Sequence, residues 1–433
     1  MTWRASVVRP PDNRRPAPLA PPTPLRRADA APPVRRASAA GAVLGTILDH
    51  GPVARSTVAR LTGLSPAAVS GHCAQLLARG LIRERAQTTG PRGLGRPHIP
   101  LEIDTRRYLV AGSHIAVTNS TVALMDLRGR IVAQDRRPHR DPEPEQVLGG
   151  MAGRLSGLTA AAGAGRTVLG LGLATGYRVD TAAGTIIDHP RLGWRDVPAR
   201  DLLTAATGLP VHVDSHSRAL ARAEQLFGDV SARDSCVLLF VGAVVDAAFA
   251  TAGTVHRGPR SSAGSVAHLP VGSLGADRHA RPPQGAEPCV CGTPGCLQSE
   301  VSEPSVLRRA RARGLPVADF PDLLELAVAG DEVAKGLFRR RARLVGRVAA
   351  WLLDMFDPEV LVVVEQGAGR MPECLAELRA EVGRRSWVCD DPERSVVPSS
   401  FTGSVLPVAG GAVALGTLYA DPLGPWPAFS AAG

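Results

Sequence analysis

Long apolar runs and aromatic side chains are what this chain of 433 residues has least of. It contains no run of 18 or more apolar residues, so the sequence predicts no membrane-spanning helix. The N-terminus carries arginines without the apolar segment of a secretory signal, so we expect a cytoplasmic protein. Aromatic residues make up only 4%, so alanine, valine and leucine must build the cores of the two or three domains that this length predicts.

Cysteine is scarce as well, with seven residues in the chain, yet Cys289, Cys291 and Cys296 fall within eight positions. Two cysteines separated by one residue do not easily reach the geometry of a disulfide, whereas both can reach a tetrahedral Zn²⁺. The glycines between them allow the tight turns that such a site needs. We therefore expect a structural zinc site in a reducing compartment.

A tetrahedral zinc site needs a fourth ligand in addition to the three cysteines. His268 is the best candidate, because it lies just upstream on what reads as a strand. His256 and His279 are its competitors.

Lysine is absent from residues 1–107, which nevertheless hold 17 Arg against 6 Asp+Glu and so carry a net charge of +11. The whole chain carries +10, so residues 108–433 sum to about −1. This asymmetry predicts a polyanion-binding N-terminal part joined to a near-neutral body, with a solvated basic tail as the alternative. Residues 1–36, rich in Pro and Arg, read as a disordered tail.

Residues 37–104 have the pattern of a winged helix-turn-helix DNA-binding domain. Apolar residues at helical spacing predict a first helix that ends at Gly51-Pro52, and a short second helix follows. Ser65-Pro66 predicts the start of a third helix, with serine as the N-cap and proline in the first turn. Two short strands, at 81–85 and 98–103, complete the wing. A protein-interaction module is the alternative, but the local charge favours double-stranded operator DNA.

The third helix and the wing supply the candidate DNA contacts. The wing tip alternates arginine with glycine and proline and resembles the Gly-Arg-Pro core of AT-hook segments, which suits a narrow A·T-rich minor groove. An ordinary solvated wing loop is the alternative. The residues that we expect to contact DNA are Ser65, Ser70, His72, Gln75, Arg92 and Arg96.

Residues 105–433 alternate between predicted strands and helices, and the metal motif within them carries a family resemblance. The motif is a histidine, a short connecting segment and then Cys-x-Cys-Gly-x-x-Gly-Cys-Leu. It resembles the signature of the ROK family of repressors, uncharacterised reading frames and sugar kinases. The resemblance extends over roughly residues 40–425. The resemblance implies an α/β fold with two actin-like ATPase lobes. It also implies that the structural zinc ligands are His268, Cys289, Cys291 and Cys296.

The segments that match the catalytic loops of ROK kinases are altered in this chain. In the first phosphate loop, which resembles Asp-x-Gly-x-Thr, His114 stands in place of the acid. In the second phosphate loop, Val244 and Asp246 stand in place of glycines, and Asp246 would repel a phosphate. His216 stands at the position of the acid that deprotonates the sugar. Because these changes coincide, we expect no enzymatic activity.

The resemblance also implies a sugar pocket, whose three carboxylates are missing here. The residues at the sugar-contacting positions are Ser215, His216, Ser265, His268 and Gln298. Their neutral donors and acceptors could still hold a carbohydrate effector.

We therefore predict a transcriptional regulator that acts as a repressor, with a pseudokinase body that binds zinc and forms a homodimer or higher homo-oligomer. The rivals are a ROK sugar kinase with an appended DNA-binding domain, and an architectural DNA binder without a ligand.

Overall fold

The computed structural model describes residues 37–85, 99–163, 165–228, 234–271, 289–292, 295–401, 403 and 405–426. All of these residues belong to one compact unit, residues 35–433. In these parts of the chain, no helix has both the length and the apolar character needed to cross a membrane. The expected tail at 1–36 and the wing arginines lie outside the described residues.

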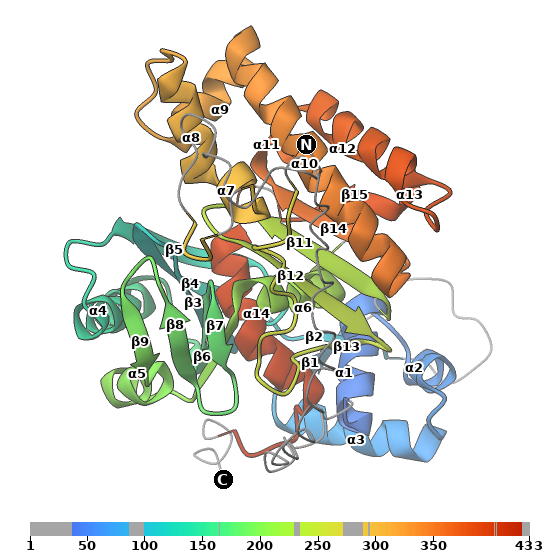
Figure 1. Cartoon of the computed structure of the whole chain (residues 1–433). Coiled ribbons are helices and arrows are strands. Elements are labelled where there is room, and N and C mark those ends of the chain that lie inside the picture. Colours follow the sequence, from blue (N-terminus) through green and yellow to red (C-terminus); the bar gives the residue numbers. More distant parts are fainter. Residues whose placement is uncertain are drawn as a thin grey trace, which may run out of the picture. The chain divides into compact units, whose positions relative to one another are not determined.

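Three helices and a two-stranded wing begin the described chain, as the sequence predicts (Figure 1). Ser65 caps the third helix by accepting a hydrogen bond from Ala68 N at 3.2 Å, and Gly63 forms the preceding turn with φ of 69°. The wing strands pair antiparallel, with Ile82 opposite Ile103. The elements are α1 (Ala39–His50), α2 (Arg55–Thr62), α3 (Pro66–Ala78), β1 (Ile82–Glu84) and β2 (Leu101–Ile103).

The first lobe of the body is a five-stranded mixed sheet with strand order β10-β6-β3-β4-β5. Its central strand β3 is buried along its whole length, because helices cover both faces. The strands are β3 (Tyr108–Ile115), β4 (Asn119–Asp126), β5 (Ile131–Pro138), β6 (Thr167–Thr175) and β10 (Val211–Ser215), and the helices of one face are α4 (Pro144–Ala162) and α5 (Ala199–Thr207).

The other face of this sheet is covered by α14 (Val405–Ala420), which packs backbone to backbone against β3 and β6. This closeness requires glycine on both sides. A Cβ added to Gly112 would lie 2.4 Å from Gly411 N, and one added to Gly172 would lie 2.1 Å from Gly410 O. A small antiparallel sheet of β7 (Arg178–Asp180), β8 (Thr185–His189) and β9 (Trp194–Val197) follows β6.

The second lobe is another five-stranded sheet with order β13-β12-β11-β14-β15, in which β11 and β14 run parallel. Its strands are β11 (Cys236–Val241), β12 (Val245–Thr251), β13 (Thr254–Val255), β14 (Val360–Glu365) and β15 (Val396–Pro398). Its helices are α6 (His216–Phe227), α7 (Leu297–Val301), α8 (Glu303–Ala312), α9 (Phe320–Val328), α10 (Glu332–Phe356), α11 (Gln366–Arg370), α12 (Pro372–Arg385) and α13 (Pro392–Ser395). The two lobes therefore have the predicted α/β, actin-like architecture.

The winged helix packs against the end of α14 rather than hanging free of the body. Arg79 Nη1 donates hydrogen bonds to the carbonyls of Pro422 and Gly424, each at 3.0 Å. Tyr108 Oη donates to the carbonyl of Arg79 at 2.9 Å, and Ser38 N donates to the carbonyl of Ala420 at 2.9 Å. One apolar cluster continues from the three helices into β3, β4 and α14.

Candidate functional site

Four potential metal ligands meet between the second sheet and α7. The ligand atoms of His268, Cys289, Cys291 and Cys296 all lie within 4.8 Å of one another, and Cys289 Sγ lies 3.5 Å from His268 Nδ1. The histidine expected as the fourth ligand therefore lies beside the three cysteines. Of its competitors, His256 stacks on Phe249, and His279 lies outside the described residues.

The strand predicted for His268 is wrong, because this residue lies in a turn. Backbone hydrogen bonds then hold the following residues against the last cysteine, with Val271 N donating to Gly295 O at 3.1 Å and Leu297 N donating to Leu269 O at 2.9 Å. These contacts form only an isolated bridge between Pro270 and Cys296. They are nevertheless sufficient to bring the histidine beside the sulfurs.

The donor set itself fits a metal ion. Burial raises the pKa of the Cys289 thiol to about 12, and the neighbouring Cys291 and Cys296 thiols contribute to this rise. A cation bound among the three sulfurs would instead stabilise their thiolate forms. Three sulfurs and one imidazole are the donors that closed tetrahedral sites use.

A cavity of about 320 Å³ lies beside the metal ligands, and His268 and Cys289 form part of its wall. The rest of the lining comes from the small sheet, the start of α6, the turn before β12 and the loop that precedes His268. Two lining residues that are not glycine, Tyr177 and Ser261, hold left-handed backbone conformations with φ of 63° and 49°. Such strain tends to persist where a site constrains the chain.

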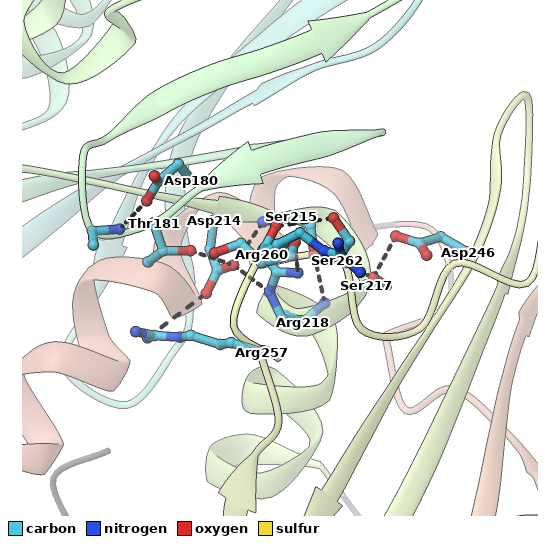
Figure 2. Close-up of polar contacts among 12 residues, drawn as sticks. Asp180, Thr181, Asp214, Ser215, Ser217, Arg218, Asp246, Arg257, Arg260 and Ser262 are labelled. Carbon is cyan, nitrogen blue, oxygen red and sulfur yellow. Dashed lines mark hydrogen bonds and ion pairs between the residues drawn. The ribbon is translucent and has the colours of Figure 1, made fainter. Parts of the chain in front are cut away.

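An ion-pair network centred on Asp214 and Arg218 includes two residues that line this cavity, Arg218 and Ser261 (Figure 2). Asp214 Oδ1 accepts from Arg218 Nε at 2.6 Å and from Thr181 Oγ1 at 3.1 Å, and Arg257 Nη2 lies 4.0 Å from Asp214 Oδ2. Arg218 is almost fully buried, and its Nη1 donates to Ser261 O at 2.9 Å. The network thus ties α6 to the loop at 261 and places a guanidinium in the cavity wall.

Asp246 supplies a carboxyl group to the same cavity. Its Oδ2 accepts from Ser217 Oγ at 2.8 Å, and its Oδ1 accepts from Ala247 N at 3.0 Å. Burial raises the pKa of Asp246 to about 7, although Ser217 and Arg218 act in the opposite direction. From the sequence, Asp246 was expected only to repel a phosphate. Its position in the wall of the cavity was not predicted.

Comparison with known proteins matches residues 110–414 to the family described as the ROK family. The chain belongs to the ROK family. It is 33% identical over 411 residues to a transcriptional regulator of Mycobacterium tuberculosis strain H37Rv, covering 89% of this chain and 87% of the relative. It is also 22% identical to the xylose repressor of Bacillus subtilis strain 168, covering 83% of this chain and 90% of the repressor.

Solved structures of the family share the fold. A ROK transcriptional regulator described as a homolog of the Escherichia coli MLC protein superposes with a TM-score of 0.72 at 21% identity, covering 88% of this chain and 96% of that one. A ROK glucokinase from Streptomyces griseus, in complex with glucose and AMPPNP, gives a TM-score of 0.59 at 24% identity, covering 71% and 98%. More than a quarter of this chain is not covered by the superposition on the glucokinase.

The expected effector residues divide into two groups in the structure. His268, Ser265 and Gln298 line the cavity, whereas Ser215 and His216 are not among its lining residues. The Gln298 amide is already engaged, accepting from Val245 N and donating to Ala243 O at 2.8 Å each. Gln298 therefore holds the altered second phosphate loop in place.

Ser215 and His216 have structural surroundings instead. Ser215 is the N-cap of α6, and its Oγ accepts from Arg218 N at 3.4 Å. The His216 ring is buried between His114 and Phe240, whose ring centroids lie 5.9 Å and 4.2 Å away. Burial lowers the pKa of His216 to about 3 and that of His114 well below its usual value.

The candidate DNA contacts on α3 differ in exposure. Ser70 and Gln75 are exposed, as a reading helix requires, while His72 is half-buried and its Nδ1 has no hydrogen-bond partner among the described residues. Ser65 is exposed and caps the helix, as the sequence predicts. Arg92 and Arg96 lie outside the described residues, so their contacts remain predictions.

Proposed function

We propose that this ROK protein is a DNA-binding transcriptional repressor whose body binds a carbohydrate effector without phosphorylating it. One observation carries the proposal: a winged helix-turn-helix is packed onto the body, in which His114 and His216 stack together. By the family resemblance, these two histidines stand at the acid positions of the kinases. The regulator and repressor names of relatives that match 89% and 83% of this chain support this direction.

DNA binding is assigned to α3 and the wing. The exposed Ser70 and Gln75 would face the major groove, with Arg92 and Arg96 beside it. Helix-turn-helix proteins commonly bind two half-sites as dimers, so a homodimer on a palindromic operator is part of the proposal.

The carbohydrate effector is assigned to the cavity beside the metal ligands. Polar groups for sugar hydroxyls are present at Asp246, Arg218, Ser262 and Ser265, and Tyr177 offers an aromatic face. A structural zinc ion held by His268 and the three cysteines would fix one wall of this cavity. The xylose-related names of several relatives are consistent with a carbohydrate.

A sugar kinase with an appended DNA-binding domain is the second candidate, favoured only by the shared fold of the ROK glucokinase. The buried His114 and His216 argue against this candidate. A kinase needs an acidic side chain near its metal-bound nucleotide and a general base that can reach the sugar hydroxyl, and these two buried imidazoles supply neither. Asp246, which lines the cavity, stands by the family resemblance in the second phosphate loop, where its carboxylate would repel a phosphate.

The proposal is tested by selecting DNA from a random pool with the purified protein and then measuring affinity for the selected site with and without each member of a carbohydrate panel. A palindromic site, and weaker binding with at least one carbohydrate, are expected. Asp246→Asn should reduce that response, while Asp201→Asn, on the exposed surface of α5, is the matched control. Failure to select any sequence would reject DNA-specific regulation, and a site that no carbohydrate affects would reject the effector.

A further inference from the structure

One tryptophan stands out on the surface of the second lobe. Trp387 is 94% exposed, which no other large apolar side chain in the described parts of the chain matches. Val388 follows it at 49%, and Met355 and Phe356, at the end of α10, are 61% and 38% exposed. These four residues are called the Trp387 patch below.

The exposure of Trp387 is built into the fold rather than being the consequence of a frayed loop. Asp354 Oδ1, in the last turn of α10, accepts from Ser386 Oγ at 2.6 Å, from Trp387 N at 3.0 Å and from Val388 N at 3.4 Å. Ser386 Oγ in turn accepts from Cys389 N at 3.0 Å. One carboxylate thus fixes the segment between α12 and α13 against the end of α10.

The base of the patch is fixed as well. The Phe356 ring stacks on Phe249 of β12, with centroids 4.2 Å apart, so the apolar surface continues into the second sheet. Trp is the residue most often found at the energetic centre of protein interfaces, because it buries a large area with few rotatable bonds. A rigidly held and fully exposed Trp with apolar neighbours therefore indicates a surface that another molecule covers.

The charged residues on either side of Trp387 in the chain indicate what kind of molecule covers this surface. Exposed Arg384 and Arg385 precede it, and exposed Asp390 and Asp391 follow it. Both arginines share one carboxylate, Glu381, which Arg347 also contacts, so this side of the tryptophan has an excess of positive charge. A surface segment with exposed arginines before the tryptophan and exposed aspartates after it can pair with a second copy of itself, basic end against acidic end, under a two-fold rotation.

We propose that the Trp387 patch is the surface through which two copies of this chain associate, in a two-fold contact that places the arginines of each copy against the aspartates of the other. The proposal rests on the function proposed above, because a palindromic operator requires a two-fold dimer. It adds the location and the chemistry of that contact.

The test measures the mass of the full-length chain by light scattering across micromolar concentrations. Trp387→Ser should weaken dimerisation by about 30-fold or more, as expected for an interface centre. Val333→Ser is the control, since Val333 is 45% exposed at the opposite end of the same helix α10. Zinc content and unfolding temperature, measured on both variants, establish that the fold is retained.

Charge reversal tests the two-fold arrangement separately. Arg385→Glu and Asp390→Arg should each weaken dimerisation alone, and mixing the two variants should restore a dimer with one copy of each. An unchanged mass for Trp387→Ser would overturn the proposal, including the case in which the patch binds a different protein. DNA selection with the winged helix is a separate readout, so failure of this contact is distinguishable from failure of the proposed function.

Discussion

His114 and His216 lie parallel in the interior, with ring planes 2° apart and centroids 5.9 Å apart. They come from the end of β3 and the start of α6, and Phe240 of β11 closes the stack on the His216 side. A Cβ added to Gly176 would lie 3.3 Å from His216, so the backbone also approaches this ring closely. Two histidines thus fill space where the family resemblance places the acidic groups of the kinases.

This pair predicts a specific dependence of stability on pH. The pKa of His216 is lowered to about 3 by burial, so below pH 6.5 the unfolded chain binds a proton that the folded chain does not. The free energy of unfolding should therefore fall as pH decreases from 6.5, by about 2 kcal/mol at pH 5 for this residue. His114 acts in the same direction.

His216→Phe keeps a flat ring in the stack but removes the titrating group, so its loss of stability between pH 7.5 and pH 5 should be smaller by about 2 kcal/mol. Urea unfolding followed by circular dichroism measures this difference. The buried carboxyl groups of Asp246 and Glu303 have raised pKa values and act in the opposite direction, but they are common to both proteins and cancel. Parallel pH profiles for the two proteins would contradict the prediction.

The second prediction concerns catalysis. The purified protein should not phosphorylate glucose, N-acetylglucosamine or xylose with ATP, because the family resemblance puts the buried His216 at the position of the general base and Asp246 in the second phosphate loop. A coupled assay with a ROK glucokinase as the positive control measures this. Turnover that His216→Ala abolishes would show that the site is catalytic.

The third prediction concerns the metal. Purified protein should contain about one zinc ion per chain, and Cys291→Ala should lose it and unfold at a lower temperature. Cys389→Ala, at a half-buried cysteine outside the cluster, is the matched control and should keep the metal. Elemental analysis with thermal unfolding measures both. A metal-free protein of unchanged stability would contradict the assignment.

The sequence predicts best those parts of the fold that are set by signals within a few residues, such as helix caps and prolines. The third helix begins at Pro66 after the Ser65 cap, as expected, because both signals act within one turn. The three cysteines of the metal cluster were predictable for a similar reason, since they fall within eight adjacent residues. His268 lies further upstream, and the sequence alone left His256 and His279 as alternatives. The strand expected at His268 was not formed, because hydrogen bonds to residues 295–298 fix that segment as a turn and a single bridge.

Long-range contacts explain what the sequence did not reveal about the cavity. Gln298 was a candidate ligand by position, but its amide is taken up by the backbone of Ala243 and Val245, more than 50 residues away. The Asp214–Arg218 pair has a local signal, the i,i+4 spacing at a helix start, yet nothing local shows that Arg218 is buried in the cavity wall. Burial of this kind depends on the packing of the two lobes.

The fourth prediction concerns sequence reading by α3. Ser70→Ala and Gln75→Ala should relax sequence preference more than they weaken nonspecific binding, because both side chains are exposed on the helix that would enter the major groove. The measurement compares affinities for the selected site and for unrelated DNA at one salt concentration. Equal losses on both DNAs would show that these residues only approach the backbone.

The last prediction concerns the wing. Affinity should fall steeply with salt, with a log–log slope of roughly −0.9 for each phosphate contact. Arg92→Ala and Arg96→Ala should each cost about 1–3 kcal/mol, mainly at sites flanked by A·T-rich DNA, because a narrow minor groove concentrates negative potential around an inserted arginine. A contact with the phosphate backbone alone would give similar losses on A·T-flanked and G·C-flanked sites. Measuring both variants on both flanks at fixed salt separates the two modes, and equal losses would leave the wing as a charged loop.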